Sequence, residues 1–264
     1  MRRLACAAAA LVAVSLSATP RARAQDTTRK QVAPPAAADT DSTARPSLPV
    51  NGLLLRAQHE RYEMTVVSPD STHVVGMRDV DAQLSTYGAF PAWRIVETRS
   101  GAVASVDTLY ASYTDLRPLH WSSTQGLSRL ALEFTPDSIY GGTSGPSGDH
   151  TIMMANRGDL LAGAPMTELA LQQMPLSVGR VDSVSVLVID LGSSRILPAT
   201  LSVDGEQDVT TGLGRTHCWV VTLNTALGVR RMWVAESDPV VVQTRQDIPG
   251  MPNSVLVERL VSRR

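Results

Sequence analysis

The sequence predicts a mainly β protein, with a large curved or partly closed antiparallel sheet and one short helix. Two observations predict this class. Short runs of alternating apolar and polar residues fill the chain from Arg61 to its end, and turn residues such as Ser68-Pro69-Asp70 separate them every ten residues or so. The chain also lacks the regular alternation of strand and helix patterns that a parallel sheet requires.

The first 24 residues have the layout of a secretory signal peptide. Arg2 and Arg3 precede an apolar run over residues 4–16, and residues 22–24 form a small-x-small cleavage site. The apolar run is too short to cross a bilayer, and no other run reaches that length. We therefore expect a periplasmic or secreted protein without a transmembrane segment in its mature chain.

Residues 25–50 are a predicted disordered tail, rich in Pro, Ala, Thr and Asp and without an aromatic residue. Such a composition cannot bury enough apolar surface to offset the entropy of ordering the chain. The remaining residues, 51–264, form one predicted β-rich domain. The sequence leaves open whether this domain is a single sheet or two β halves joined by a helix.

Removing the signal peptide leaves 20 basic and 25 acidic residues, and one cysteine, Cys218. The acidic balance disfavours nucleic acid or an anionic membrane surface as a partner, because both require basic patches. With one cysteine no internal disulfide can form, so the fold must depend on its core.

The strand patterns follow one another in order along the chain. The first are RYEMTVVS from Arg61, STHVVGMRDVDAQLSTYG from Ser71, AWRIVETRS from Ala92 and AVASVDTLYASY from Ala102. One segment, PMTELALQQMPL at residues 165–176, departs from this pattern. Its apolar residues recur at helical spacing and a proline closes the run, so we predict a short amphipathic helix there. Strand patterns then resume and continue to the end.

The stretch GRTHCWVVTL, residues 214–223, places a histidine beside the cysteine. The pair could be a nucleophile with its base, a metal ligand pair or part of a plain strand. Successive side chains of a strand point to opposite faces, so His217 and Cys218 cannot form a catalytic dyad there. Cys218 lies in phase with Val220 and is predicted to be a small core residue.

The stretch GGTSGPSGDH, residues 141–150, contains residue types used in acyl transfer, namely Ser144, Ser147, Asp149 and His150. Neither serine lies in a Gly-x-Ser-x-Gly pattern that is followed by a helix. The four glycines and the proline of this stretch predict a hairpin loop instead. An envelope serine hydrolase built on Ser147 and His150 is therefore the least favoured function.

The sequence predicts no metal site, no cofactor and no catalytic residues. The five histidines lie far apart, without a second ligand at metal spacing. The carboxylates, among them Glu97, Asp107 and Asp115, are scattered too, so no general acid–base pair can be named. We expect these carboxylates on the solvated faces of strands.

The turn NTALG, residues 224–228, joins two strands. Pairing that is symmetric about Ala226 would place Trp219 opposite Trp233 on the face that Cys218 does not occupy. Both faces of this hairpin would then be apolar, whereas a sheet in water normally keeps one wet face. Each apolar face therefore needs a cover.

A further turn near Ser237 would bring Val242 beside Trp233. Trp219, Trp233 and Val242 are therefore the candidate residues for binding an apolar ligand, which would cover this face. The alternative is that the helix around Leu169 covers the tryptophans.

Residues 106–126 and 212–250 resemble uncharacterised secreted bacterial proteins of the lipoprotein-carrier-like fold group, relatives in architecture of the periplasmic carriers LolA and LolB. The shared features are a strand with Asp107 that leads into a Leu-Arg-Pro step, a PL-x-x-G step at residues 175–179, and the late strand in MWVAESDPVVVQTR. Over residues 61–260 the resemblance implies a curved sheet around a helical lid, with an apolar concave face. No residue matches an acyl-chain site individually, so ligand binding is implied by fold analogy alone.

These observations predict a non-catalytic periplasmic protein that binds or carries an apolar ligand, such as a lipid or a lipoprotein acyl chain, or assists envelope assembly. The alternative is a structural or protein-interaction module with a fully packed sheet, whose partner would be another envelope protein.

Overall fold

The computed structural model describes residues 48–102, 104–156, 160–190 and 193–264. The predicted signal peptide, residues 1–24, and the predicted tail up to residue 47 lie outside these residues. The last residues of that predicted tail pack against the core, through Leu48 and Val50.

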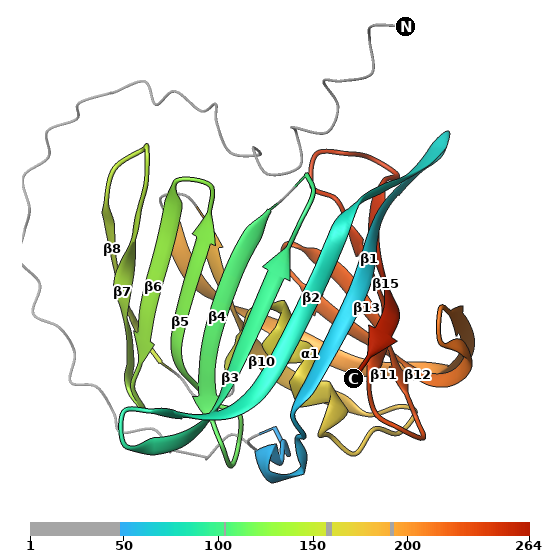
Figure 1. Ribbon diagram of the computed structural model, residues 1–264, viewed down its shortest axis with the longest axis horizontal. Helices are drawn as coiled ribbons and strands as arrows, with labels where there is room; N and C mark the ends of the chain where they lie inside the picture. Colours follow the sequence, from blue (N-terminus) through green and yellow to red (C-terminus); the bar gives the residue numbers. More distant parts are fainter. Residues whose placement is uncertain (1–47, 103, 157–159, 191–192) are drawn as a thin grey trace, which may run out of the picture.

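The described residues form one open sheet of 15 strands with a single α-helix, α1 (Figure 1), which confirms the predicted mainly β class. The strands of the N-terminal half are β1 (Gln58–Ser68), β2 (Ser71–Tyr87), β3 (Phe90–Arg99), β4 (Ser105–Ser112), β5 (Pro118–Gln125), β6 (Ser128–Phe134), β7 (Ser138–Ser144) and β8 (His150–Ala155). After β9 (Leu160–Ala162) and α1 (Ala164–Gln172) come β10 (Val181–Asp190), β11 (Ser193–Thr211), β12 (Gly214–Thr225), β13 (Gly228–Ala235), β14 (Val241–Asp247) and β15 (Val255–Arg263).

The two β halves share this one sheet, which answers the question that the sequence left open. Strands β1 to β8 form one antiparallel meander and β10 to β15 form another. The halves join where β1 pairs with β15, for example Met64 with Glu258. The short β9 pairs in parallel with β10, and β8 and β9 are the two edges of the sheet.

Helix α1 lies inside the curve of the sheet, on the face that we call concave (Figure 1). The prediction of a helix here is confirmed, but the amphipathic character is wrong, because all its residues from Pro165 to Gln172 are buried. Met166 and Leu169 pack into a core with the N-terminal half, while Leu171 packs into a core with the C-terminal half. A helix enclosed by sheet on both sides has no wet face to which polar residues could be assigned.

Both faces of β12 and β13 are apolar, as predicted, and each has its own cover. The concave face packs against α1 through Val221 and Met232. A bulge at Val203 to Gly205 interrupts the pairing of β11, and beyond it β11 returns to the outer side of β15. There Gly212 lies against Val261, since a Cβ on this glycine would be 3.5 Å from the Val261 backbone.

Within the described ranges, no helix is long and apolar enough to cross a membrane.

Candidate functional site

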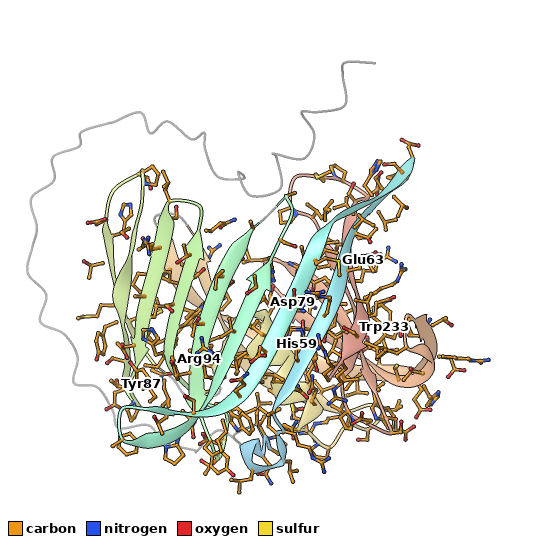
Figure 2. All side chains as sticks on the ribbon, viewed as in Figure 1. His59, Glu63, Asp79, Tyr87, Arg94 and Trp233 are labelled. Atoms are coloured by element: carbon orange, nitrogen blue, oxygen red, sulfur yellow. The ribbon has the colours of Figure 1, made fainter. Side chains whose placement is uncertain are left out.

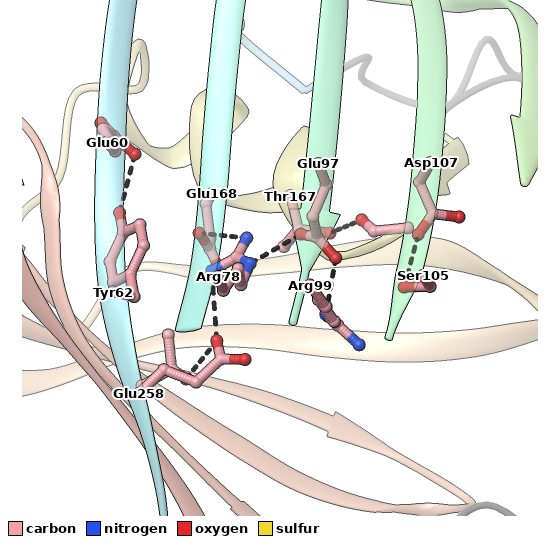
Figure 3. Close-up of polar contacts among 12 residues, drawn as sticks. Glu60, Tyr62, Arg78, Glu97, Arg99, Ser105, Asp107, Thr167, Glu168 and Glu258 are labelled. Carbon is pink, nitrogen blue, oxygen red and sulfur yellow. Dashed lines mark hydrogen bonds and ion pairs between the residues drawn. The ribbon is translucent and has the colours of Figure 1, made fainter. Parts of the chain in front are cut away.

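A fully buried arginine, Arg78 of β2, is the centre of an ion cluster on the concave face (Figure 3). Its Nε donates to Glu97 Oε2 at 2.6 Å. Its two Nη atoms donate to the two carboxylate oxygens of Glu168 at 3.1 and 2.9 Å, and Nη1 also donates to Glu258 Oε2 at 3.1 Å. The guanidinium also lies 4.9 Å from the centre of the Tyr62 ring, a cation–π contact. Arg78 thus connects β2 to β3, to α1 and to β15.

Two further arginines complete this cluster and balance its charge. Arg230 Nη2 donates to Glu168 and lies 3.7 Å from Glu258 Oε2. Arg99 Nε lies 2.8 Å from Glu97 Oε1 as an ion pair. Three arginines therefore face three glutamates, and such pairing is what makes burial of so many charges tolerable.

The pKa of Glu258 reflects this pairing. Burial by itself raises the pKa of a carboxyl, but Arg78, followed by Arg99 and Arg230, outweighs burial and lowers the pKa of Glu258. Glu258 is therefore held ionised. For Tyr62, burial and then the nearby Glu60 raise the pKa of the phenol well above its usual range, so it stays neutral.

The outer face of the same strands carries an exposed ion pair. Arg61 Nε lies 2.7 Å from Asp79 Oδ1, one register position from the Tyr62–Arg78 pair. Asp79 is labelled on β2 in Figure 2. Neighbouring residues of a strand point to opposite faces. The paired strands β1 and β2 can therefore carry the exposed Arg61 on one face and the buried Arg78 on the other.

A cavity of about 600 Å³ adjoins the ion cluster on the concave face. Its apolar walls are Ile95, Leu109, Trp121, Ala162, Pro165, Leu187, Ile189, Ile248 and Leu256. Its polar lining includes Glu97, Arg99, Ser105, Asp107, Ser123, Gln125, Arg230, Thr244, Gln246, Asp247 and Glu258. A volume of this size lies within the range of about 300–1,000 Å³ that is typical of small-molecule sites.

Asp107 lies on the cavity wall next to the ion cluster, because it is the cross-strand neighbour of Glu97. Trp121 Nε1 donates to its Oδ1 at 3.3 Å. Burial raises the pKa of Asp107, while hydrogen bonds from Ser123 and Trp121 and the charge of Arg99 act in the opposite direction. The cavity therefore combines apolar walls with a hydrogen-bonding and charged end.

A family model described as a protein of unknown function (DUF3108) matches residues 61–253, most of the chain. The chain belongs to this family. The matched range begins in β1, ends before β15, and contains α1 and most of the residues that line the cavity. No curated protein matches the chain at a significant level.

Solved structures give distant matches to this DUF3108 protein. A β-barrel-like protein of a domain of unknown function, DUF1849, from Brucella abortus has a TM-score of 0.49 at 10% identity, covering 82% of this chain and 98% of that chain. The hypothetical lipoprotein YmcC from Escherichia coli K12 gives 0.34 at 13% identity, covering 80% and 86%. A protein with a YmcC-like fold from Bacteroides fragilis gives 0.32 at 9%, covering 83% and 98%.

The candidate ligand residues Trp219, Trp233 and Val242 do not lie as predicted. The turn has two residues, so Trp219 pairs with Val234 and Val220 with Trp233. The assumed symmetry about Ala226 is therefore wrong, and the two indoles lie on opposite faces, with Trp233 on the face of Cys218. Gly228 at φ +139° ends the tight turn, and a shift of one residue in register reverses the face of a whole strand.

Trp233 is 6% exposed and its Nε1 donates to Gln207 Oε1 at 2.9 Å. Val242 lies at a bulge between β13 and β14 and belongs to the same buried core as Trp233. Trp219 is half-buried against the concave core. Other residues line the concave cavity, and a ligand-binding role for these three stays a prediction.

His217 and Cys218 are separated, as predicted. Cys218 is fully buried, and His217 is exposed on the other face, with Nδ1 2.8 Å from Asp208 Oδ1. Burial, with a smaller contribution from Asp208, raises the pKa of the Cys218 thiol to about 11. Among the described residues, no group of three or more His, Cys, Asp or Glu is arranged to hold a metal ion.

Cys218 is expected to resist alkylation in the folded protein. In a chain that begins at Gln25, iodoacetamide at about pH 8 should leave the intact mass unchanged until urea unfolds the chain. The reason is that the reagent modifies only a thiolate that it can reach. As a control, Ser147→Cys places a thiol on an exposed loop and should add one rapid adduct. Rapid alkylation of Cys218 in the folded chain would contradict its role as a core residue.

The loop with Ser147 and His150 joins β7 to β8 as a hairpin, as predicted. Both residues are exposed. A strand follows the loop, and the strand-to-helix turn of a nucleophile elbow is not formed there.

The sequence interpretation missed the ion cluster. Glu97 was expected on a solvated strand face and is 2% exposed, and Asp107 lines the cavity; Asp115 is half-buried beside Arg117. A signal did exist, because Arg78 lies in phase with apolar Val80 on β2. A charged residue in phase with a buried face requires a charged partner elsewhere in the fold, which a single sequence does not identify.

Proposed function

We propose that this protein binds an amphiphilic ligand, an apolar chain with a polar head, in the concave cavity, and that it does so without catalysis. The observation that carries this proposal is the cavity of about 600 Å³, which has apolar walls and a charged end. Binding pockets typically combine a mostly apolar lining with a few polar groups that fix orientation.

The elements that build the cavity support this proposal. Its walls come from strands of both halves of the sheet and from the start of α1. The buried Arg78 contacts hold α1 and β15 together on the β2 and β3 strands. Sites supported on strands and locked side chains are held more precisely than sites on loops, so a ligand would meet a preformed surface.

We further propose that this binding takes place in the cell envelope. The signal-peptide pattern over residues 1–24 supports export. The resemblance to the lipoprotein-carrier-like fold group favours an acyl chain, of a lipid or a lipoprotein, as the apolar part of the ligand, by analogy alone. Native mass spectrometry of envelope-purified protein, followed by lipid extraction, would identify the bound species.

Ser123→Phe is expected to block the cavity. Ser123 lines it from β5, so a phenyl ring there would occupy the ligand volume. Affinity for a fluorescent fatty-acyl probe should fall about tenfold or more, a loss of about 1.4 kcal/mol or more in binding. Titration of the purified variant measures this.

Ser122→Phe is the matched control, since Ser122 is the preceding residue of β5 and points to the outer face. It should bind the probe as the wild type does. Equal binding by both variants would place the ligand outside this cavity, and absence of probe binding by the wild type would contradict the proposed function.

One observation favours the alternative, a protein-interaction module. Strand β8 is an edge of the sheet, and its Met153 is 81% exposed beside Tyr140 of β7. An exposed edge strand with apolar side chains can pair with a strand of another protein. Native mass spectrometry separates the two functions, because a module would retain a protein partner and no lipid.

A further inference from the structure

Two of the carboxylates that line the concave cavity have no cationic partner. The charged residues of the lining are Glu97, Asp107, Asp247, Glu258, Arg99 and Arg230. Both glutamates and both arginines belong to the ion cluster around Arg78, in which three arginines balance three glutamates. The excess negative charge of the lining therefore comes from Asp107 and Asp247, and among the described residues neither aspartate forms an ion pair.

A ligand in the cavity can reach both aspartates. Asp247 is exposed and Asp107 is partly exposed, whereas the two glutamates of the lining are buried. Ser105 Oγ donates to Asp107 Oδ2 at 3.5 Å (Figure 3), and Trp121 Nε1 donates to Oδ1 at 3.3 Å. Both donors are neutral, so they orient the carboxylate of Asp107 without neutralising its charge.

The charges beside Asp107 favour a cation at this place. Asp107 of β4 is directly opposite Glu97 of β3. Burial is the largest cause that raises the pKa of Asp107, and the negative charge of Glu97 raises this pKa by more than the positive charge of Arg99 lowers it. The surroundings of Asp107 are therefore negative, and a bound cation would relieve the repulsion.

The start of α1 does not reverse this balance. Gly163, Ala164 and Pro165 line the cavity. The N-terminus of a helix carries about half of a positive charge, and a proline in the first turn has no N–H to offer to an anion. Two unpaired carboxylates outweigh this partial charge, so the lining stays negative.

We propose that the cavity selects an amphiphile with a cationic head group, a protonated amine. The ammonium group donates to the carboxylate of Asp107, and the apolar tail lies along Leu109, Trp121 and Leu187. This inference rests on the proposed function, because it specifies the ligand of the same cavity. Hydrogen bonds between charged partners are roughly twice as strong as those between neutral ones, so the head group should contribute strongly to selectivity.

Calorimetric titration of the purified protein with octylammonium, octan-1-ol and octanoate tests this. At neutral pH the amine is protonated, as a lysine side chain is. Salt at about 0.15 M screens charges more than about 8 Å apart, which limits general attraction of cations to an acidic protein. Octylammonium should bind about tenfold or more tightly than octan-1-ol, and octanoate should bind most weakly.

Asp107→Asn should weaken octylammonium binding about tenfold and change octan-1-ol binding by less than about twofold. The amide has nearly the same shape as the carboxylate and keeps an oxygen that can accept from Trp121 Nε1. Asp149→Asn is the matched control, because it removes the same charge from an exposed residue in the loop between β7 and β8. It should leave binding of all three amphiphiles unchanged.

The ligand series on the wild-type protein decides the inference even if Asp107→Asn does not fold. Octylammonium binding no tighter than that of octan-1-ol or octanoate would overturn the cationic head group and leave the proposed function standing. Undiminished octylammonium binding by a folded Asp107→Asn, or an equal loss in Asp149→Asn, would do the same. Binding of none of the three amphiphiles would overturn both.

Discussion

Replacing Arg78 with methionine is expected to destabilise the protein by about 3–5 kcal/mol, because the change leaves buried carboxylates without their main partner. Arg78 is fully buried and donates to Glu97, Glu168 and Glu258. Methionine fills much of the same volume, so lost packing contributes little. Urea unfolding of wild type and variant at neutral pH measures the difference in the free energy of unfolding.

Arg61→Met is the control, because Arg61 makes the exposed ion pair with Asp79 on the outer face of the same strands. Exposed pairs contribute little, so this variant should unfold close to the wild-type midpoint. An Arg78→Met variant as stable as the wild type would show that the buried cluster does not hold the two halves and the helix together.

The wild-type protein should also lose stability in acid through Glu258. Its pKa in the folded state is lowered by Arg78, Arg99 and Arg230 against the effect of burial. A carboxyl with a lowered pKa adds stability above its ordinary pKa and loses it as the pH falls toward the lowered value. Glu60 acts in the opposite sense, because burial raises its pKa. Since Arg78 is the largest source of the lowering at Glu258, Arg78→Met should have a weaker loss of stability in acid.

Trp233→Ala is expected to cost about 3–5 kcal/mol, the usual effect of truncating a large aromatic side chain in a packed core. Trp233 is 6% exposed, belongs to the same core as Cys218 and Val242, and is hydrogen-bonded to Gln207. Urea unfolding again measures the loss. Binding of a fatty-acyl probe to the folded fraction should stay unchanged, since the cavity has other residues in its walls.

Trp233→Phe separates packing from hydrogen bonding. It keeps most of the apolar contacts and removes the N–H, so it should cost about 1 kcal/mol, with the Gln207 carbonyl left to find another donor. A loss of about 1–2 kcal/mol for Trp233→Ala would instead mean that the indole borders empty space. Together with weakened probe binding, that result would return Trp233 to the ligand site.

The hairpin that contains both tryptophans shows how much of this region the sequence could predict. Alternation predicted the strands, the two apolar faces and the separation of His217 from Cys218, because these depend only on the period of a strand. Whether Trp219 and Trp233 lie opposite each other on one face depended on whether the turn has two or three residues. The NTALG sequence lacks the Asn-Gly or Asp-Gly pair that marks a two-residue turn, so the register was left to tertiary packing.

The sequence by itself determined the mainly β class, the place of the helix and the core position of Cys218, since periodicity and turn residues are local properties. Only the tertiary structure decided that the two halves form one sheet around α1, and that Arg78, Glu168 and Glu258 meet beside a cavity. These residues lie 90 and 180 positions apart along the chain. Their contact follows from how the sheet curves and pairs β1 with β15, and no local pattern encodes which distant charges will neutralise one another.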